Sequence, residues 1–484
     1  MTKIPNQKYQ AEISQKPTEQ LEAIPIALGD DYHHSVKRRL FSGTVWALGG
    51  RLTTVVSMLA VNALLARMLS PTDLGQYFLL FSLVVVTALV AQLGLNRAGV
   101  RLIAEALARS ETEQATDRAA AVLQIGLASA VLVGLLLFAG VGRWVVETIM
   151  GSPTITDYLG YAATWAASTA IVLLMAEIFR GYHEVRNATL FNGMVTNVLM
   201  AVLLGGLWMT KTSGMSLNAV LFVTVLATVV SVLAAAWFLK QLVRVIRKVS
   251  RDVYVEVIRE AWPLFLASMA MVVLTQADLW ILARYRPHTE VAIYGAAARL
   301  VLIMFMPLLI VSAALSPLIT EMHTQKRIVH LERVLRAVST MTSIPMILML
   351  AMFIFFGGPI LALVYGEYYR SGETILAVLS LSYLFLMWVG TADTTLMLTG
   401  HRLSIMVCAL VGGTISIALA LLLVGPYGSI GVAAATATGL GTFYVAAWLV
   451  VREKVGVWTH VGFPNASHLH DVWKLVRRRA LRDY

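Results

Sequence analysis

The chain alternates long apolar stretches with short polar ones. A helix needs about 20 consecutive apolar residues to cross a hydrocarbon core of about 30 Å. Stretches that meet this length run over residues 42–66, 74–96, 119–141, 158–180, 189–210, 217–239, 261–283, 291–319, 338–361, 373–398, 403–424 and 429–451. The pattern therefore predicts an all-α polytopic membrane protein with about twelve transmembrane helices.

Composition agrees with this class and excludes others. Hydrophobic residues make up 58% of the 484-residue chain and charged residues only 13%, too few to cover a soluble domain. The single cysteine, Cys408, excludes a disulfide framework and a cysteine-based zinc cluster, and we expect no metal site and no bound cofactor. Turns such as "GPYG" leave no space for a catalytic domain outside the membrane, so we do not expect an enzyme.

Lysine and arginine gather on one side of this predicted topology. Of the 38, 30 fall in segments on the side of the N-terminus, 6 on the opposite side, and 2, Arg51 and Arg299, inside spans. Such an excess marks the cytoplasmic side, so both termini are predicted to be cytoplasmic. The net charge of +11 follows from this topology, and no nucleic-acid partner is expected.

The two halves of the chain resemble each other. "LARMLSPTDLGQY" (65–77) returns as "LARYRPHTEVAIY" (282–294), and "RLIAE" ending at Glu105 returns as "PLITE" ending at Glu321. The near-constant spacing predicts a parallel internal repeat that forms two six-helix lobes. The same repeat places Arg299 opposite Ser82 of the first half.

This repeat divides the chain into five segments. We expect a disordered cytoplasmic tail, an N-lobe of spans 1–6, a basic amphipathic linker, a C-lobe of spans 7–12, and a basic C-terminal tail with an amphipathic helix. These segments are 1–36, 37–239, 240–260, 261–451 and 452–484. The linker and the helix at 469–484 are expected to lie on anionic lipid.

Two arginines lie deep inside predicted spans. Arg51 is in the middle of "VWALGGRLTTVVSMLAV" (45–61), and Arg299 is eight residues inside Val291. A charge at the bilayer centre costs roughly 2.5–3.5 kcal/mol, so each arginine needs a partner. Structural partners would be Asp278 for Arg299, and helix carbonyls or Asp393 for Arg51.

Other polar residues are candidates for lesser roles. Buried carboxylates at membrane depth can carry a proton or bind sodium, so Asp278 and Asp393 could couple transport to H+ or Na+ unless they only form salt bridges. Asn62, Trp46 and Asn192 could line a cavity, although asparagine in spans more often bonds across helices.

Two sequence motifs resemble those of a known protein family. "LLARMLSPTDLGQY" (64–77) and "LGLNRAGVRLIAE" (93–105) are similar to the opening of bacterial polysaccharide-biosynthesis flippases. These flippases belong to the multidrug/oligosaccharidyl-lipid/polysaccharide exporter superfamily. The similarity covers about residues 37–452.

The resemblance implies a V-shaped pair of lobes in the bacterial cell (inner) membrane that works by alternating access. The substrate would be an undecaprenyl-diphosphate-linked oligosaccharide repeat unit, moved from the cytoplasmic to the outer leaflet for surface polysaccharide or exopolysaccharide biosynthesis. An ion gradient would drive it, and a polysaccharide polymerase and chain-length machinery would be partners. The diphosphate would be the anion for Arg51 and Arg299, because the arginine fork matches phosphate oxygens.

Two other functions remain open. A multidrug exporter of the same fold would bind organic cations and favour an acidic cavity, for which Asp278 and Asp393 are available. A membrane-embedded polysaccharide polymerase or ligase would need catalytic loops on the outer side. The flippase hypothesis further expects Arg51 and Arg299, one from each lobe, to face a shared water-filled chamber.

Overall fold

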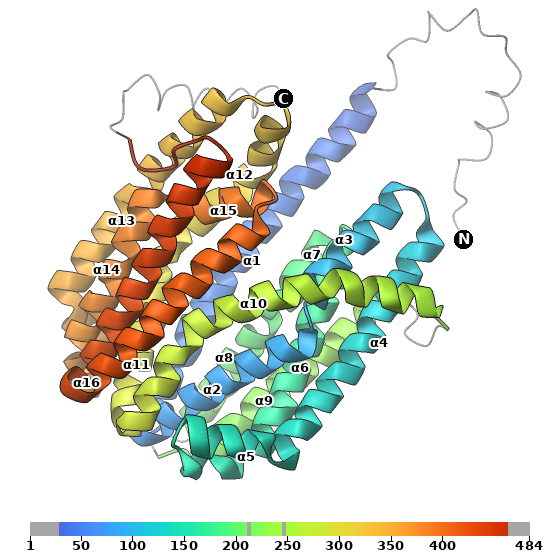
Figure 1. Cartoon of the computed structure of the whole chain (residues 1–484). Helices are drawn as coiled ribbons and strands as arrows, with labels where there is room; N and C mark the ends of the chain where they lie inside the picture. Colours follow the sequence, from blue (N-terminus) through green and yellow to red (C-terminus); the bar gives the residue numbers. More distant parts are fainter. Residues whose placement is uncertain (1–28, 211–213, 244–247, 463–484) are drawn as a thin grey trace, which may run out of the picture.

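The computed structural model describes residues 29–210, 214–243 and 248–462, and within them the chain is helical and contains no strand. Figure 1 shows the helices running roughly along one direction in two groups. The α-helices are α1 (Gly29–Met68), α2 (Pro71–Gln92), α3 (Leu95–Ala108), α4 (Thr112–Leu136), α5 (Gly142–Trp144), α6 (Leu159–Gly181), α7 (Val185–Thr189), α8 (Val195–Thr210), α9 (Leu217–Leu239), α10 (Arg251–Tyr285), α11 (His288–Val301), α12 (Met306–Thr324), α13 (Ile328–Tyr365), α14 (Glu373–Val389), α15 (Ala392–Leu398) and α16 (Arg402–Lys454). Short π- and 3-10-helical turns connect some of them: η2 (Leu137–Val141), η3 (Val145–Ile149), η4 (Pro153–Tyr158), η5 (Leu190–Met194), η6 (Leu302–Phe305) and η7 (Glu367–Gly372).

The predicted spans lie on helical segments, although the span 74–96 is interrupted between α2 and α3 and the span 373–398 between α14 and α15. Within the described residues, 10 helices are long and apolar enough to cross a membrane. One of them, α16, contains two predicted spans joined by a bend at Gly428, where φ is 56° and ψ is −137°. The span predicted at 261–283 lies on α10. The predicted all-α polytopic fold with two lobes is therefore confirmed.

The internal repeat is visible in where helices begin and end. α2 begins at Pro71 and α11 at His288, and α3 and α12 end at Ala108 and Thr324. The two offsets, 217 and 216 residues, are those of the sequence motifs. In α2 the start follows from "SPTD": Ser70 Oγ accepts a hydrogen bond from the Asp73 backbone N–H at 3.2 Å, and proline occupies the first helical position.

The lobes meet where α2 packs against α11. Gly75 faces the backbone of His288, and Gly295 faces the ring of Phe78, so closely that a Cβ atom at either glycine would overlap these neighbours. Glycine at both positions therefore lets the two helices approach. One hydrophobic core includes buried residues of both lobes, such as Leu74 and Val291.

The observed helix bounds differ from the predicted segments at two places. α1 begins at Gly29, eight residues before the predicted lobe boundary, and residues 1–28 lie outside the described part. Residues 251–260 of the predicted linker are the first turns of α10, which continues without a break into the membrane span. The predicted amphipathic helix at 469–484 also lies outside the described residues.

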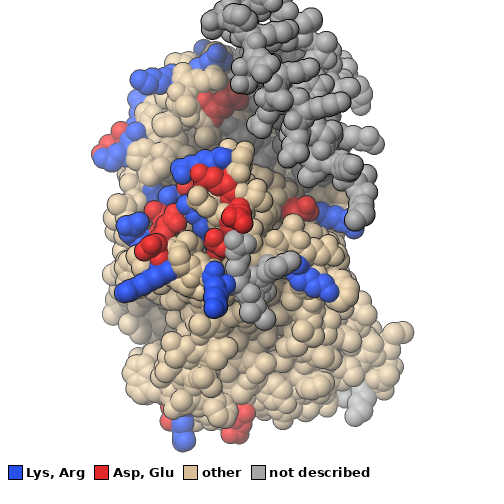
Figure 2. Space-filling model, turned by 90° about the vertical axis from the view of Figure 1, so that its right-hand side faces the viewer, with Lys and Arg blue, Asp and Glu red and all other residues tan. Residues whose placement is uncertain are grey.

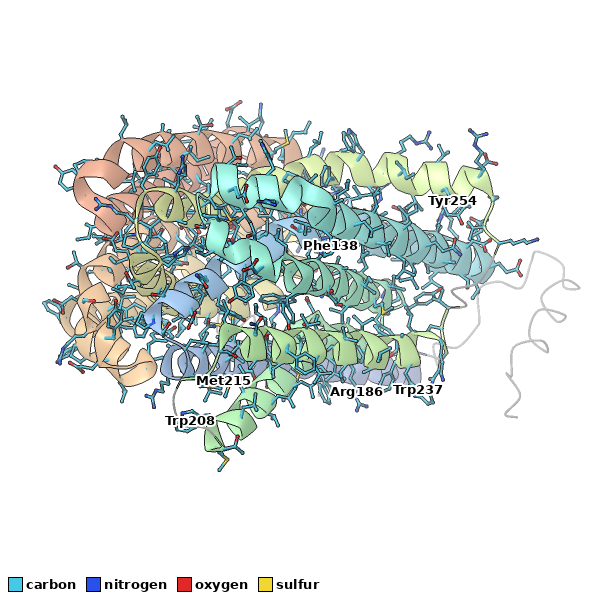
Figure 3. The ribbon with its side chains drawn as sticks, turned by 90° about the horizontal axis from the view of Figure 1, so that it is seen from below. Phe138, Arg186, Trp208, Met215, Trp237 and Tyr254 are labelled. Carbon is cyan, nitrogen blue, oxygen red and sulfur yellow. The ribbon has the colours of Figure 1, made fainter. Side chains whose placement is uncertain are left out.

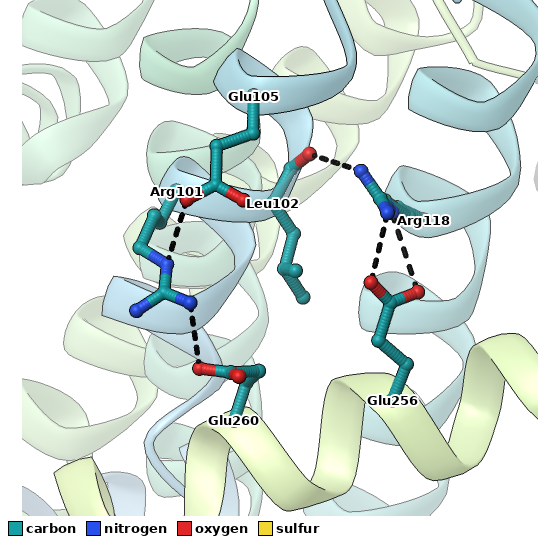
Figure 4. A network of polar contacts seen from close by, with 6 residues as sticks. All are labelled: Arg101, Leu102, Glu105, Arg118, Glu256 and Glu260. Carbon is teal, nitrogen blue, oxygen red and sulfur yellow. Dashed lines mark hydrogen bonds and ion pairs between the residues drawn. The ribbon is translucent and has the colours of Figure 1, made fainter.

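Ion pairs attach the start of α10 to the N-lobe (Figure 4). Glu256 pairs with Arg118 of α4 at 2.8 Å, and Glu260 pairs with Arg101 of α3 at 2.9 Å. Arg118 also donates to the Leu102 carbonyl at 3.1 Å. Over these residues the segment predicted to lie on lipid is instead held against two N-lobe helices, because its acidic side chains find arginine partners there.

Charged and aromatic side chains follow the expected membrane zones. Figure 2 shows charged residues gathered mainly on the upper part of the molecule, with an uncharged belt below them. Figure 3 shows Trp208 and Met215 at one end of the N-lobe helices and Arg186, Trp237 and Tyr254 at the other. Trp208 and Trp237 are exposed, as expected for tryptophans at the two membrane interfaces.

Candidate functional site

Two cavities meet where the lobes touch. One, of 160 Å³, lies inside the N-lobe among α1, α2, α6, α8 and α9. The other, of 230 Å³, lies between α1 and the segment from α11 to α12. Met58, Asn62 and Arg299 line both cavities, and neither cavity has an aspartate or glutamate in its lining. The one charged side chain shared by these cavities is therefore a cation.

Arg299 comes from the C-lobe and reaches the N-lobe. Its guanidinium carbon lies 4.3 Å from the ring centroid of Phe81 and 5.7 Å from that of Phe78, both on α2. Arg299 is eleven residues after the start of α11, which places it about 17 Å along the helix, near the middle of the bilayer. The aromatic faces stabilise its positive charge without neutralising it.

The guanidinium of Arg299 has no ion-pair partner and no hydrogen-bond acceptor among the described residues. Buried charges in proteins are normally paired, because an isolated charge in an apolar medium is strongly disfavoured. A half-buried arginine that faces two cavities without an acceptor is thus prepared for an anion that comes from outside the protein.

Asp278 forms no ion pair with Arg299. Its Oδ2 accepts a hydrogen bond from the Tyr294 hydroxyl at 2.7 Å, and its Oδ1 accepts one from the Leu279 backbone N–H at 2.8 Å. The Tyr294 hydroxyl is also 3.3 Å from Thr436 Oγ1. The predicted salt bridge with Arg299 is not formed, and Asp278 instead joins a polar cluster between α10, α11 and α16.

Arg51 lies elsewhere. Its Nη1 donates to the Leu309 carbonyl of α12 at 3.5 Å, which is the predicted alternative of a helix carbonyl rather than Asp393. Leu309 lies ten residues after Arg299, which is about 15 Å farther along the helical segment that runs from α11 into α12. Arg51 lines neither cavity described above. Neither of these two cavities is therefore lined by both arginines.

Of the four remaining predicted site residues, one lines the two cavities and three do not. Asn62 is buried and lines both cavities. Trp46 is exposed, with Arg186 at 5.2 Å from its ring, and Asn192 is exposed at the bend in η5. Asp393 accepts from the Thr394 hydroxyl at 3.3 Å, outside both cavities.

Phe81, like Met58 and Phe78, is a site residue that the sequence did not predict. It directly precedes Ser82, the repeat counterpart of Arg299. Because α2 and α11 pair across the axis that relates the lobes, a residue beside that counterpart comes close to Arg299. The repeat alignment therefore contained the signal that could have identified Phe81.

Comparison with protein families shows which family the chain belongs to. The family described as polysaccharide biosynthesis protein matches residues 40–323, which is more than half of the chain. The chain belongs to this family. A second family, MatE, matches residues 263–422 of the chain. None of the curated protein sequences compared with it matches.

Several solved structures share the fold of this chain, although their sequence identity to it is low. An inward-facing multidrug resistance MATE family transporter of the MOP superfamily is 17% identical, with a TM-score of 0.71, covering 85% of this chain and 98% of its own. The lipid II flippase MurJ in an inward closed conformation is 16% identical, with a TM-score of 0.66 and coverages of 91% and 93%. A MOP superfamily transporter from Pyrococcus furiosus, described as having a binding pocket of reverse polarity, is 16% identical, with a TM-score of 0.64 and coverages of 87% and 96%.

These comparisons confirm the predicted superfamily. The chain is a multi-span membrane protein of the polysaccharide biosynthesis family, and its structural neighbours are described as transporters of the MOP superfamily and a lipid II flippase.

Proposed function

We propose that the protein is a flippase that moves an undecaprenyl-diphosphate-linked oligosaccharide from the cytoplasmic to the outer leaflet of the bacterial inner membrane. The observation that carries this proposal is the unpaired guanidinium of Arg299, which lines both cavities at the junction of the lobes. A diphosphate supplies the missing acceptor, because its oxygens match the planar donor fork of arginine.

The volumes of the two cavities limit which part of the substrate they can hold. At 160 and 230 Å³ they accommodate a group of the size of a diphosphate but not an oligosaccharide. Loading and release of the whole head group thus require the lobes to move apart, as in alternating access. The glycan and its diphosphate cross between the lobes while the lipid tail remains in the membrane.

Arg51 and Asp278 have separate roles in this proposal. Arg51 is exposed near the start of the apolar part of α1 (Gly49–Met68), about 16 Å from Asn62, and it provides a first contact for the diphosphate before Arg299. Asp278 is the candidate for coupling to H+ or Na+, because its cluster with Tyr294 lies beside the helix that carries Arg299. A polysaccharide polymerase and chain-length machinery would receive the product.

A multidrug exporter is the second candidate, because several structural neighbours are MATE transporters. An organic cation in either cavity would face Arg299 without any carboxylate in the lining. Like charges in a site of low dielectric constant repel strongly. The cavities therefore favour the anionic substrate.

The experiment is a comparison of arginine variants in a strain whose surface glycan depends on this protein. We expect Arg299→Ala to lower surface glycan roughly tenfold or more, the loss of one charge-assisted contact, and to accumulate undecaprenyl-linked intermediate on the cytoplasmic leaflet. Arg299→Lys, which keeps the charge but not the fork, should be intermediate.

Arg370→Ala is the matched control, because Arg370 is an exposed arginine that pairs with Glu367 away from both cavities. It should transport normally. Normal surface glycan in Arg299→Ala at native protein levels would refute the proposal. So would efflux of organic cations that is abolished by the same substitution.

A further inference from the structure

A second hollow lies away from the junction of the lobes. It is a groove of 500 Å³ between α14 and the second half of α16. Leu381 and Phe385 line it from α14, and Gly441, Val445 and Leu449 line it from α16. Both helices belong to candidate membrane spans, so the groove opens within the hydrocarbon region.

The lining of the groove is mainly apolar. Thr438 and Thr442 are its polar residues, and their hydroxyls donate to the carbonyls of Ala434 and Thr438 in their own helix at 2.8 and 2.9 Å. The threonine methyl groups remain for contact. The two hydroxyls have then no hydrogen left to donate to a ligand and the rest of the lining is apolar, so the fitting occupant is a hydrocarbon chain.

One end of the groove leads to tryptophans and a cation. Trp388 continues the helical stripe of Leu381 and Phe385, and Trp448 continues that of Val445. The two indole rings lie 4.8 Å apart. Tryptophan is the residue that prefers the level of lipid headgroups, so this end of the groove corresponds to the membrane interface.

Arg452 lies one turn beyond Trp448. It is exposed, its guanidinium stacks 4.9 Å from the Trp458 ring centroid, and its Nη1 donates to the Gly456 carbonyl at 2.8 Å. Among the described residues it forms no ion pair. Burial, together with nearby Arg336, lowers the pKa of the adjacent His460, which is therefore neutral near pH 7. Arg336 pairs with Glu332 at 3.9 Å, so the cation at this end without an ion pair among the described residues is Arg452.

The aromatic end of the groove is held in place by the chain that follows α16. Thr459 Oγ1 donates to the Val389 carbonyl at 2.7 Å, and the Val461 backbone N–H donates to the Trp388 carbonyl at 2.9 Å. Ser339 Oγ donates to the Thr459 carbonyl at 2.7 Å. These bonds satisfy the last carbonyls of α14 and fix the tryptophans, so the site exists before anything binds.

We propose that this groove binds one anionic phospholipid of the membrane. An acyl chain lies along Leu381, Phe385 and Val445, and the phosphate of the headgroup binds Arg452. An apolar channel, an aromatic interface and an unpaired cation follow one another in the order that such a lipid requires.

The test measures phosphatidylglycerol retained by the purified full-length protein, by native mass spectrometry against phosphatidylethanolamine. Thr442→Phe fills the groove from its edge and should reduce retention several-fold, whereas Leu422→Phe, at an exposed position on the same helix outside the groove, should not. Arg452→Ala should lower the preference for phosphatidylglycerol about fivefold, the effect of one basic residue at an anionic leaflet.

Lys454→Ala is the matched charge control, because Lys454 pairs with Glu453 at 2.9 Å. Equal losses from Arg452→Ala and Lys454→Ala would mean that general charge attracts the lipid, and the proposal would be wrong. Undiminished retention by Thr442→Phe would also overturn it. Displacement of phosphatidylglycerol by equimolar undecaprenyl phosphate would show that the occupant is the carrier lipid instead.

Discussion

The guanidinium of Arg299 lies 4.3 Å from the centre of the Phe81 ring, across the contact between the two lobes. One residue supplies a charge from the C-lobe, and the other supplies an aromatic face from the N-lobe. Such a pair keeps a cation inside the protein without cancelling its charge. It also makes the site dependent on the lobes being together, because a rocking motion that separates α2 from α11 separates the charge from its support.

Replacement of Phe81 should therefore weaken transport although Phe81 carries no charge. Phe81→Leu removes the ring face and lets the guanidinium move, and we expect the apparent KM for the lipid-linked substrate to rise about threefold to tenfold. Proteoliposome flipping assays at several substrate densities would measure this. Phe138→Leu, at an exposed position on η2, is the control. An unchanged KM in Phe81→Leu would mean that the ring does not position Arg299.

The fold could be predicted from sequence to an unusual extent because the bilayer imposes length and polarity on each element. The repeat motifs even predict that α2 and α11 begin at equivalent residues. The start of α10 could not be obtained in the same way. Glu256 and Glu260 occur in a basic segment, and sequence alone does not show that Arg118 and Arg101 of other helices face them.

The polar site could be predicted only in part. Asp278 is seven residues before the end of α10, and Tyr294 is six residues after the start of α11, so the turn between the helices brings them to the same level. Arg299 is five residues deeper, about 8 Å. Helix geometry therefore favours Tyr294 over Arg299 as the partner of Asp278. The height of Arg51 relative to Arg299 depends on how the lobes pack, which no local pattern specifies.

The two ion pairs of α10 should differ in their effect on stability. Arg118 has a side chain only 10% exposed and also donates to a carbonyl, whereas the side chain of Arg101 is 48% exposed. Arg118→Met leaves Glu256 without its partner and should lower the free energy of unfolding by about 2–4 kcal/mol. Arg101→Met should cost about 0–1 kcal/mol.

Thermal unfolding of both variants in the same detergent would measure this difference. The Arg118→Met variant should melt several degrees lower, because it loses a partly buried pair. Equal melting temperatures for the two variants would contradict the attachment of the start of α10 to the N-lobe through Arg118.

Asp278→Asn tests coupling separately from substrate binding. The amide oxygen still accepts the Tyr294 hydrogen bond, so the cluster can persist, but the side chain can no longer take up or release a proton. We expect flipping driven by a pH or sodium gradient to be lost, and substrate binding to remain. Asp393→Asn is the comparison for the second candidate carboxylate, because Asp393 bonds to Thr394 and not to Tyr294. If the Asp278→Asn variant still flips substrate normally in a pH or sodium gradient, Asp278 has only a structural role.

The direction of transport depends on which end of the helices faces the cytoplasm. The only cysteine, Cys408, is buried, so a Cys408→Ser background allows single cysteines to be labelled with a membrane-impermeant maleimide. Ser216 and Ser371 are exposed at one end of the spans, and Thr112 and Gln325 are exposed at the other. We expect cysteines at the first pair to react in intact cells, and cysteines at the second pair to react only after permeabilisation. The opposite result would place Arg51 nearer the outer leaflet, and an anion that met Arg51 before Arg299 would then travel inward, which excludes export.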